Sequence, residues 1–267
     1  MARVKVGSAR EEGVGGVGVT AVFGAVADCY ASARPDYPPQ LYATLTDLAG
    51  RDLDAARVVD VGAGTGIAAR QMRDLGAQVV AVEPSAGMLA KLAGTSPGVG
   101  VVRGDGNALP LRDDCADFIT YAQAWHWTDP HRAVPEYRRV LGRGGSFAAW
   151  WNLTAREAPW EVAQEERLMA ACPDYRAGRD KYPGSRGDAD PTALWLGQPA
   201  QIAEFTWSRR VALNVHLANL NSKSYVAVLG HHAVGQFLAT ERAMLLAEFP
   251  DGVVTEAYRT VLAVVSR

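Results

Sequence analysis

The sequence has little cysteine, and the residues present form no recognisable site. Cys29, Cys115 and Cys172 are odd in number and far apart, and none lies in a C-x-x-C pair or a zinc-type spacing. Histidine is also scarce: the five residues are scattered, and the pair His231-His232 has no partner acid at ligand spacing. A disulfide framework and a bound metal are therefore not expected, and the free thiols suit a reducing cytoplasm.

Long apolar runs and a strong charge bias are missing as well. No segment approaches the ~18 apolar residues of a membrane-spanning helix. Residues 1–19 are rich in glycine and valine but lack the continuous apolar stretch of a secretion signal, so we expect a flexible tail. The formal net charge of −2 gives no reason to expect nucleic acid or an anionic membrane surface as a partner. These absences favour a soluble, cytoplasmic protein.

The motif that organises the chain lies at residues 57–66. Arg57 to Val61 is a short, β-branched, apolar run that suits a buried parallel strand. Glycines follow at positions 62, 64 and 66, and a helical pattern then starts at Ile67. Strand, glycine turn and helix form the first crossover of a nucleotide-binding α/β sheet. Asp60 ends the strand, where ligands dock in such sheets, although a glycine turn without a ligand would give the same pattern.

The glycine spacing distinguishes between cofactors. A dinucleotide fingerprint reads G-x-G-x-x-G, whereas here the third glycine comes one residue early and an acid precedes the first. This pattern resembles the first motif of the class I S-adenosylmethionine (SAM)-dependent methyltransferases. The resemblance suits a ligand that has no phosphate and carries a cationic amino group and a sulfonium. It implies a Rossmann-like doubly wound α/β sheet, mostly parallel with an antiparallel last strand, with N-terminal helices and an inserted lid.

Four later matches to the same family follow in order along the chain. Glu83 ends the second expected strand, about 20 residues after the glycines. A carboxylate at this position can accept hydrogen bonds from both hydroxyl groups of a ribose. Residues 104–111, Gly-Asp-Gly-Asn-Ala-Leu-Pro-Leu, resemble the family's adenine loop, with Gly106 in place of the usual alanine. Residues 123–129, Gln-Ala-Trp-His-Trp-Thr-Asp, resemble the run at the active-site lip, and residues 141–145 match the tail before the fifth strand.

An N-terminal motif refines the resemblance. Tyr30, Arg34-Pro35 and Tyr37-Pro38 are similar to the segment that folds over the SAM pocket in methyltransferases related to trans-aconitate methyltransferase. By this resemblance Tyr30 and Arg34 face cofactor or substrate. The alternative is a helix-capping turn with an aromatic side chain packed on the core.

The resemblance assigns a role to each matching position. Residues expected to bind the cofactor are Tyr30, Arg34, Asp60, Gly62, Ala63, Gly64, Gly66, Glu83, Pro84, Met88, Asp105, Gly106, Asn107 and Gln123. Trp127 and Trp151 are expected to bind the substrate. His126 is the candidate general base, because it is the best-placed side chain that titrates near neutral pH. Alternatives stay open for three of them: Met88 as a core methionine, His126 as a residue that orients the loop, and Trp127 as a packing residue.

The β/α alternation breaks after residue 151. We expect residues 20–267 to form one methyltransferase domain, with residues 152–200 as the substrate-binding insertion. The expected elements there are a helix at 157–171, a strand at 202–213, helices at 214–229 and 233–248, and a last strand at 256–265.

The leading hypothesis is therefore methyl transfer from SAM to a small molecule, a secondary metabolite or a carboxylic acid. Three alternatives are an NAD-dependent oxidoreductase, a non-enzymatic SAM-binding protein, and an enzyme that uses SAM in non-methylation chemistry such as intramolecular cyclisation. The acceptor atom and the oligomeric state, monomer or homodimer, do not follow from the sequence.

Overall fold

The computed structural model describes residues 33–172, 199–227 and 229–267. Its centre is a seven-stranded sheet with the order β3-β2-β1-β4-β5-β7-β6. The strands are β1 (Arg57–Val61), β2 (Gln78–Glu83), β3 (Gly100–Arg103), β4 (Ala116–Ala122), β5 (Leu141–Thr154), β6 (Gln201–Ala212) and β7 (Val253–Ser266). β7 runs antiparallel to both β5 and β6, and the pairs among β1 to β5 are parallel. The expected doubly wound α/β fold with an antiparallel last strand is confirmed.

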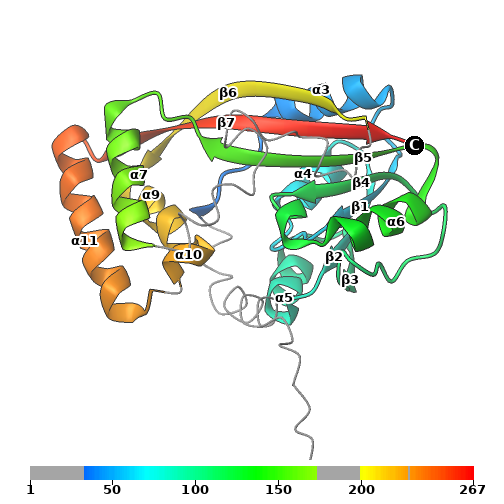
Figure 1. Ribbon diagram of the computed structural model, residues 1–267, viewed down its shortest axis with the longest axis horizontal. Coiled ribbons are helices and arrows are strands. Elements are labelled where there is room, and N and C mark those ends of the chain that lie inside the picture. The colour runs from blue at the N-terminus through cyan, green and yellow to red at the C-terminus, as the bar shows by residue number, and fades with distance from the viewer. Residues whose placement is uncertain (1–32, 173–198, 228) are drawn as a thin grey trace, which may run out of the picture.

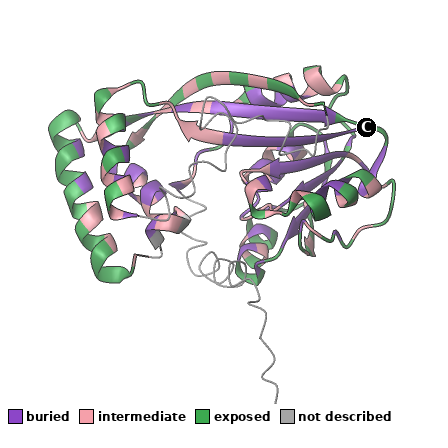
Figure 2. Cartoon of the chain, in the orientation of Figure 1, coloured by how far each residue is buried: buried purple, intermediate pink, exposed green. Residues whose placement is uncertain are grey.

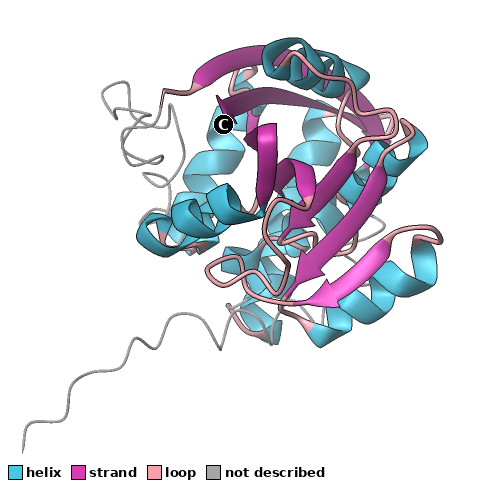
Figure 3. Cartoon of the chain, turned by 90° about the vertical axis from the view of Figure 1, so that its right-hand side faces the viewer, coloured by secondary structure: helices cyan, strands magenta, loops and turns pink. Residues whose placement is uncertain are grey.

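Helices cover both faces of the sheet, as Figure 3 shows. The core helices are α3 (Pro39–Ala49), α4 (Ile67–Asp74), α5 (Ala86–Thr95) and α6 (Pro130–Val140). Neighbouring strand residues point to opposite faces, so Val58 packs in one apolar cluster with α3, α4 and α5, whereas Val59 packs in the other with α6. Because helices cover both sides, β1 reads as a continuous apolar run rather than an alternating one.

Two helix starts follow the sequence signals. Ser85 caps α5, since its hydroxyl accepts a hydrogen bond from the Met88 N–H at 3.4 Å. Asp129 caps α6 by accepting from the His131 N–H at 3.0 Å, with Pro130 in the first turn. These caps fix the loops that precede them, and both loops lie at the carboxyl ends of sheet strands.

A second layer of helices lies at the far end of the long strands β5, β6 and β7 (Figure 1). It consists of α7 (Pro159–Ala171), α9 (Leu213–Asn221), α10 (Ser224–Ala227) and α11 (His231–Glu248), together called the cap below. Its own apolar cluster includes Leu168 of α7, Leu217 of α9 and Leu245 of α11. Figure 2 shows that α11 is largely exposed while β5 and β7 are buried.

Some boundaries differ from the sequence expectations. The fifth strand was expected to follow residue 145 but already begins at Leu141, and the expected helix 214–229 is divided into α9 and α10. The last strand starts at Val253 rather than at residue 256. The tail expected at residues 1–19, the rest of the N-terminal segment up to residue 32 and residues 173–198 of the expected insertion lie outside the described residues. No helix in the described ranges is long and apolar enough to cross a membrane.

Candidate cofactor and acceptor site

The candidate site lies at one edge of the sheet. β1 pairs in parallel with β2 on one side and with β4 on the other. The carboxyl ends of these three strands therefore meet at the same edge, which is where ligands bind in open α/β sheets. The glycine loop, Glu83 and Gln123 follow these ends directly, so residues 60 sequence positions apart become neighbours.

The three glycines of the loop differ in what a side chain at each position would contact. Gly62 has φ +68°, and a Cβ there would lie 2.5 Å from the Cβ of Ala124. Gly66 has φ +82°, and a Cβ there would lie 2.8 Å from Leu92 Cγ. These two positions therefore need glycine for packing as well as for backbone conformation. Gly64 has φ +57°, but a Cβ there would have no atom of a described residue within 4 Å, so its backbone faces a space that the described part of the chain leaves open.

The Glu83 carboxylate is held beside this open space. Its Oε2 accepts a hydrogen bond from the Gly64 N–H at 2.9 Å, and its Oε1 accepts from the Ser85 N–H at 2.9 Å. Burial raises the pKa of Glu83, and the two backbone donors oppose that shift. Each carboxylate oxygen keeps a second lone pair, so the group is oriented and can still accept from a ligand.

Asp60 lies deeper than expected. Its side chain is fully buried, and the Thr120 hydroxyl donates to its Oδ1 at 2.9 Å. Its Oδ2 is also buried and has no hydrogen-bond partner among the described residues. Burial raises the pKa of Asp60 to about 7, and the nearby charge of Glu83 adds to the rise. An orphaned acid oxygen of this kind is stabilised by a cation placed near it.

The loop after β3 is held by its own side chains. Asp105 Oδ1 accepts from the backbone N–H of Asn107 at 2.9 Å and from its Nδ2 at 3.1 Å. Asn107 Oδ1 in turn accepts from the Asp129 N–H at 2.8 Å, which joins this loop to the active-site lip. A Cβ at Gly106 would lie 3.1 Å from Thr128 Cγ2, so the glycine allows close packing here and does not loosen the loop.

His126 makes a hydrogen bond that defines its tautomer. The indole Nε1–H of Trp151 donates to His126 Nδ1 at 3.2 Å. An indole N–H can only donate, so Nδ1 is the acceptor and the neutral ring carries its proton on Nε2. Trp127 packs beside this ring, with the two ring centroids 4.8 Å apart, and is 51% exposed. The arrangement favours the orienting role for His126, because the Nδ1 lone pair is occupied by the Trp151 indole and the protonated Nε2 has no lone pair with which to accept a proton.

Two residues expected to contact a ligand, Trp151 and Met88, have almost no exposed surface in the structure. Trp151 was expected to bind the substrate, but it has no exposed surface and packs in the core cluster with α6. It acts on the site through its hydrogen bond to His126. Met88, expected beneath the adenine, is only 2% exposed, which fits the core alternative equally well. Pro84 is exposed, and Tyr30 lies outside the described residues.

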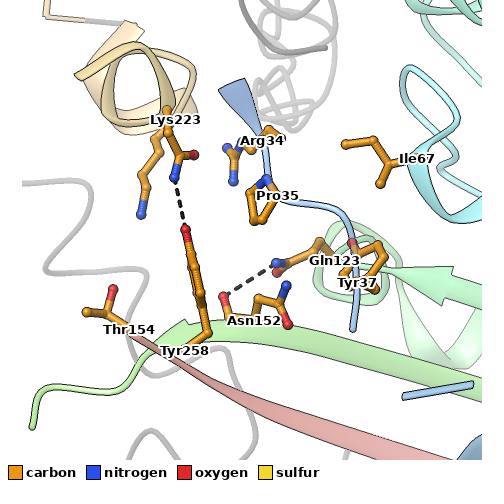
Figure 4. Close-up of a pocket in the computed structure, with 10 residues that line it drawn as sticks. Arg34, Pro35, Tyr37, Ile67, Gln123, Asn152, Thr154, Lys223 and Tyr258 are labelled. Carbon is orange, nitrogen blue, oxygen red and sulfur yellow. Dashed lines mark hydrogen bonds between the residues drawn. The ribbon is translucent and has the colours of Figure 1, made fainter. Parts of the chain in front are cut away.

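A polar cavity separates the glycine-loop side of the sheet from the cap (Figure 4). Its enclosed volume is small, about 40 Å³, and its mouth opens to solvent. It is lined by Arg34, Pro35, Tyr37, Ile67, Gln123, Asn152, Thr154, Asn219, Lys223 and Tyr258. Of the predicted site residues, Arg34 and Gln123 line this cavity. The Nε–H of Arg34 donates a hydrogen bond to the hydroxyl of the cap residue Ser222 at 2.9 Å.

Comparison with known proteins identifies the family. A family model described as a methyltransferase domain matches residues 59–149. The demethylmenaquinone methyltransferase of Renibacterium salmoninarum is 33% identical over 176 residues, which are 62% of this chain and 70% of that protein. The chain belongs to the class I SAM-dependent methyltransferases.

Further relatives agree with this family. An uncharacterized methyltransferase of Mycobacterium tuberculosis is 39% identical over 138 residues, so the chain spans 55% of that relative's length. A solved structure from Anaeromyxobacter dehalogenans, assigned as a type II methyltransferase, has a TM-score of 0.67 at 24% identity, covering 87% of this chain and 97% of that one. A methyltransferase assigned to an antibiotic biosynthesis pathway of Anabaena variabilis has a TM-score of 0.61 at 17% identity, covering 86% and 98%. At these identities the two structures show the fold alone.

SAM is the cofactor of this methyltransferase family, and the residues at the sheet edge fit it. The open space at Gly64 is a cradle that a side chain would fill. Glu83 offers oriented acceptors for hydroxyl groups, and the orphaned Oδ2 of Asp60 suits a cationic group. The individual contacts stay predictions.

Replacing Glu83 with alanine is expected to weaken SAM binding by roughly 10- to 150-fold, because losing a charged hydrogen-bond partner costs about 1.5–3 kcal/mol. Asp105→Ala should have an effect of the same order through the adenine. Titration calorimetry measures both, with Asp74→Ala, an exposed acid at the end of α4, as the control. Wild-type affinity in both site variants would show that the assignment of β2 and the loop after β3 is wrong.

Sequence reasoning missed the cap side of the methyltransferase cavity. Asn219, Lys223 and Tyr258 belong to no motif and lie more than 60 residues beyond the last family match. Only the packing of α9 against β7 brings them to the carboxyl edge of β4 and β5. A weak signal was present in the sequence, since Lys223 stands among the small polar residues Asn221, Ser222 and Ser224 inside the helix expected at 214–229.

Proposed function

We propose that the protein transfers a methyl group from SAM to a small-molecule acceptor in the cytoplasm. The observation that carries the proposal is the open space at Gly64, bordered by the Glu83 carboxylate and adjoining a polar cavity through Ile67. The matched relatives are methyltransferases, which leaves NAD-dependent oxidation and non-methylation SAM chemistry without support. A secondary metabolite or a carboxylic acid, as in the trans-aconitate methyltransferase group, are the acceptor classes that the sequence suggested.

The chain's own residues would mainly bind and align. SAM, when bound, supplies an electrophilic methyl group on its sulfonium. Gly64, Glu83 and Asp105 would fix the cofactor, while the cavity beside Ile67 and Gln123 would hold the acceptor. Alignment of two reactants in a small cavity can contribute several kcal/mol to a displacement reaction. No metal is needed for this role, and the described residues contain no cluster of three metal-ligating side chains.

The proposal is tested with isotopically labelled SAM and an acceptor library, with products identified by mass. Methylated products that require active protein and a 1:1 release of S-adenosylhomocysteine are expected. SAM binding without any methylated product, across acids, phenols, amines and thiols, would favour a binding protein or other SAM chemistry. NAD binding in place of SAM would overturn the proposal.

His126→Asn is expected to lower kcat by less than tenfold. The asparagine Oδ1 can replace Nδ1 as the acceptor for Trp151, so the loop stays in place. A general base would instead cost ~10²–10⁴ in kcat and give a rate that rises with pH through the histidine range. The measurement is a pH–rate profile between about 5 and 8 for wild type and variant. A large loss in His126→Asn, with SAM affinity unchanged, would restore the base role.

A further inference from the structure

Lys223 lies in the short loop between α9 and α10 and lines the acceptor cavity. Its side chain is half-buried and makes no hydrogen bond or ion pair with any residue in the described part of the chain. The only aromatic ring recorded near its Nζ within the described ranges is that of Tyr225, with the centroid 6.0 Å away. A half-buried ammonium without an acid partner is costly, so its presence calls for a ligand.

The two buried acids whose charges act on Lys223, Glu256 and Glu165, have cationic partners of their own, and Arg156 is the partner of Glu165. Glu256 is already bound by Arg209 Nε at 2.6 Å, by His216 Nδ1 at 2.7 Å and by the Tyr258 hydroxyl at 2.7 Å. Although burial raises the pKa of Glu256, these partners lower it to about 2. Conversely, burial lowers the pKa of Lys223 to about 8, and the charge of Arg34 adds to the decrease. The positive charges of Lys223 and Arg34 in the cavity wall are therefore not balanced by a nearby carboxylate that is free to pair with them.

Arg34 is fixed at the same end of the cavity. Its Nε donates to the Ser222 hydroxyl at 2.9 Å and its Nη2 to the Ser222 carbonyl at 3.4 Å. Because Ser222 directly precedes Lys223, these bonds hold the guanidinium close to the loop that carries the ammonium. Figure 4 shows Arg34 and Lys223 on the cap side, with Ile67 on the opposite side of the view.

Asn219 gives independent evidence for a polar ligand at this end. Its Nδ2 donates to the Tyr258 hydroxyl at 3.1 Å and to Glu256 Oε1 at 3.4 Å, which fixes the orientation of the amide. Its Oδ1 is buried and has no donor among the described residues, although Asn219 is only 5% exposed. A buried acceptor of this kind is normally satisfied, so a ligand at this end is expected to bring a hydroxyl or amino donor for Asn219 in addition to any group that the two cations bind.

We propose that the methyl acceptor carries a carboxylate that Lys223 and Arg34 bind at the cap end of the cavity, away from the atom that is methylated. The inference rests on the proposed methyl transfer. Ile67 directly follows the glycine loop and Gln123 directly follows β4, so the reacting atom belongs at their end of the cavity. The carboxylate is therefore a recognition group, and the nucleophile is a separate hydroxyl, amine or thiol of the same molecule.

The test uses two acids, 4-hydroxybenzoate and 4-hydroxycinnamate, each paired with its primary carboxamide, which has the same shape without the charge. Binding is measured by calorimetry in the presence of S-adenosylhomocysteine. Four proteins are compared: wild type, Lys223→Met, Lys223→Arg and the control Arg210→Met. Arg210 lies on β6 with its side chain 72% exposed, so the control loses the same charge outside the cavity.

We expect the acids to bind wild type at least tenfold more tightly than their amides. Lys223→Met should remove this preference, whereas Lys223→Arg and Arg210→Met should keep it. Failure of both acids to bind, equal binding of acid and amide, or an unchanged preference in Lys223→Met would overturn the inference. SAM titrations of the same proteins separate this result from the proposed function. Absence of SAM binding in wild type would refute methyl transfer. Normal SAM binding in Lys223→Met would show that this variant is folded.

Discussion

Gly64→Val is expected to reduce SAM affinity by at least 100-fold while leaving the protein folded. Among the residues that the structure describes, none has an atom within 4 Å of a Cβ at this position, so the valine side chain would project into the open space proposed for the cofactor. The same change at Gly62 would be uninformative, because its Cβ would collide with Ala124 at 2.5 Å and disturb the fold itself. Titration calorimetry with SAM and with S-adenosylhomocysteine measures the loss.

A control is needed because valine at positive φ strains the backbone wherever it is placed. Gly144 has φ +71° and equally open surroundings, and it lies in the turn at the start of β5, at the opposite edge of the sheet. Gly144→Val should therefore lower the melting temperature about as much as Gly64→Val and leave SAM affinity unchanged. Similar affinity losses in both variants would show that strain, and not occupation of the cofactor space, is responsible.

The cofactor side of the site was largely predictable because its signals are local. Residues 57–67 combine strand, glycine turn and helix in one continuous segment, and the structure has the strand and the helix at those positions. Glu83 could be placed because the crossover from β1 to β2 fixes where the next parallel strand ends. Each of these inferences needed fewer than 30 residues of sequence.

The errors arose where tertiary packing decides. Trp150 and Trp151 lie on opposite faces of β5, and both are fully buried because helices cover both faces. Nothing in the sequence distinguishes a tryptophan in this position from one that lines a pocket. Lys223 was missed for a related reason, since its place in the cavity depends on how the cap packs against β7. The sequence shows Gly106 in place of the family's usual alanine, but only the structure reveals how closely Thr128 approaches it.

Asp60→Asn is expected to stabilise the protein increasingly as the pH rises. The folded-state pKa of Asp60 is about 7, raised mainly by burial, whereas an unfolded aspartate titrates near 4. Between these values the folded protein retains a proton that the unfolded chain releases, so the free energy of unfolding falls as pH rises through this window. In Asp60→Asn the unfolding free energy does not fall in this way, because asparagine has no proton to release. The difference in unfolding free energy, variant minus wild type, should therefore grow by on the order of 2–4 kcal/mol between pH 4.5 and 8.

Denaturant unfolding of both proteins across this range gives that difference, and Asp74→Asn, an exposed acid, is the control with no expected trend. Parallel curves for Asp60→Asn and wild type would show that Asp60 titrates normally.

The same carboxyl links stability to cofactor binding, because a cation near the orphaned Oδ2 would favour the ionised form. SAM binding near pH 6.5 should then release a proton in wild type and none in Asp60→Asn, a difference that appears when binding enthalpies are compared in buffers of different ionisation enthalpy. The acid that destabilises the folded protein at neutral pH is thus the group whose charge the cofactor is expected to compensate.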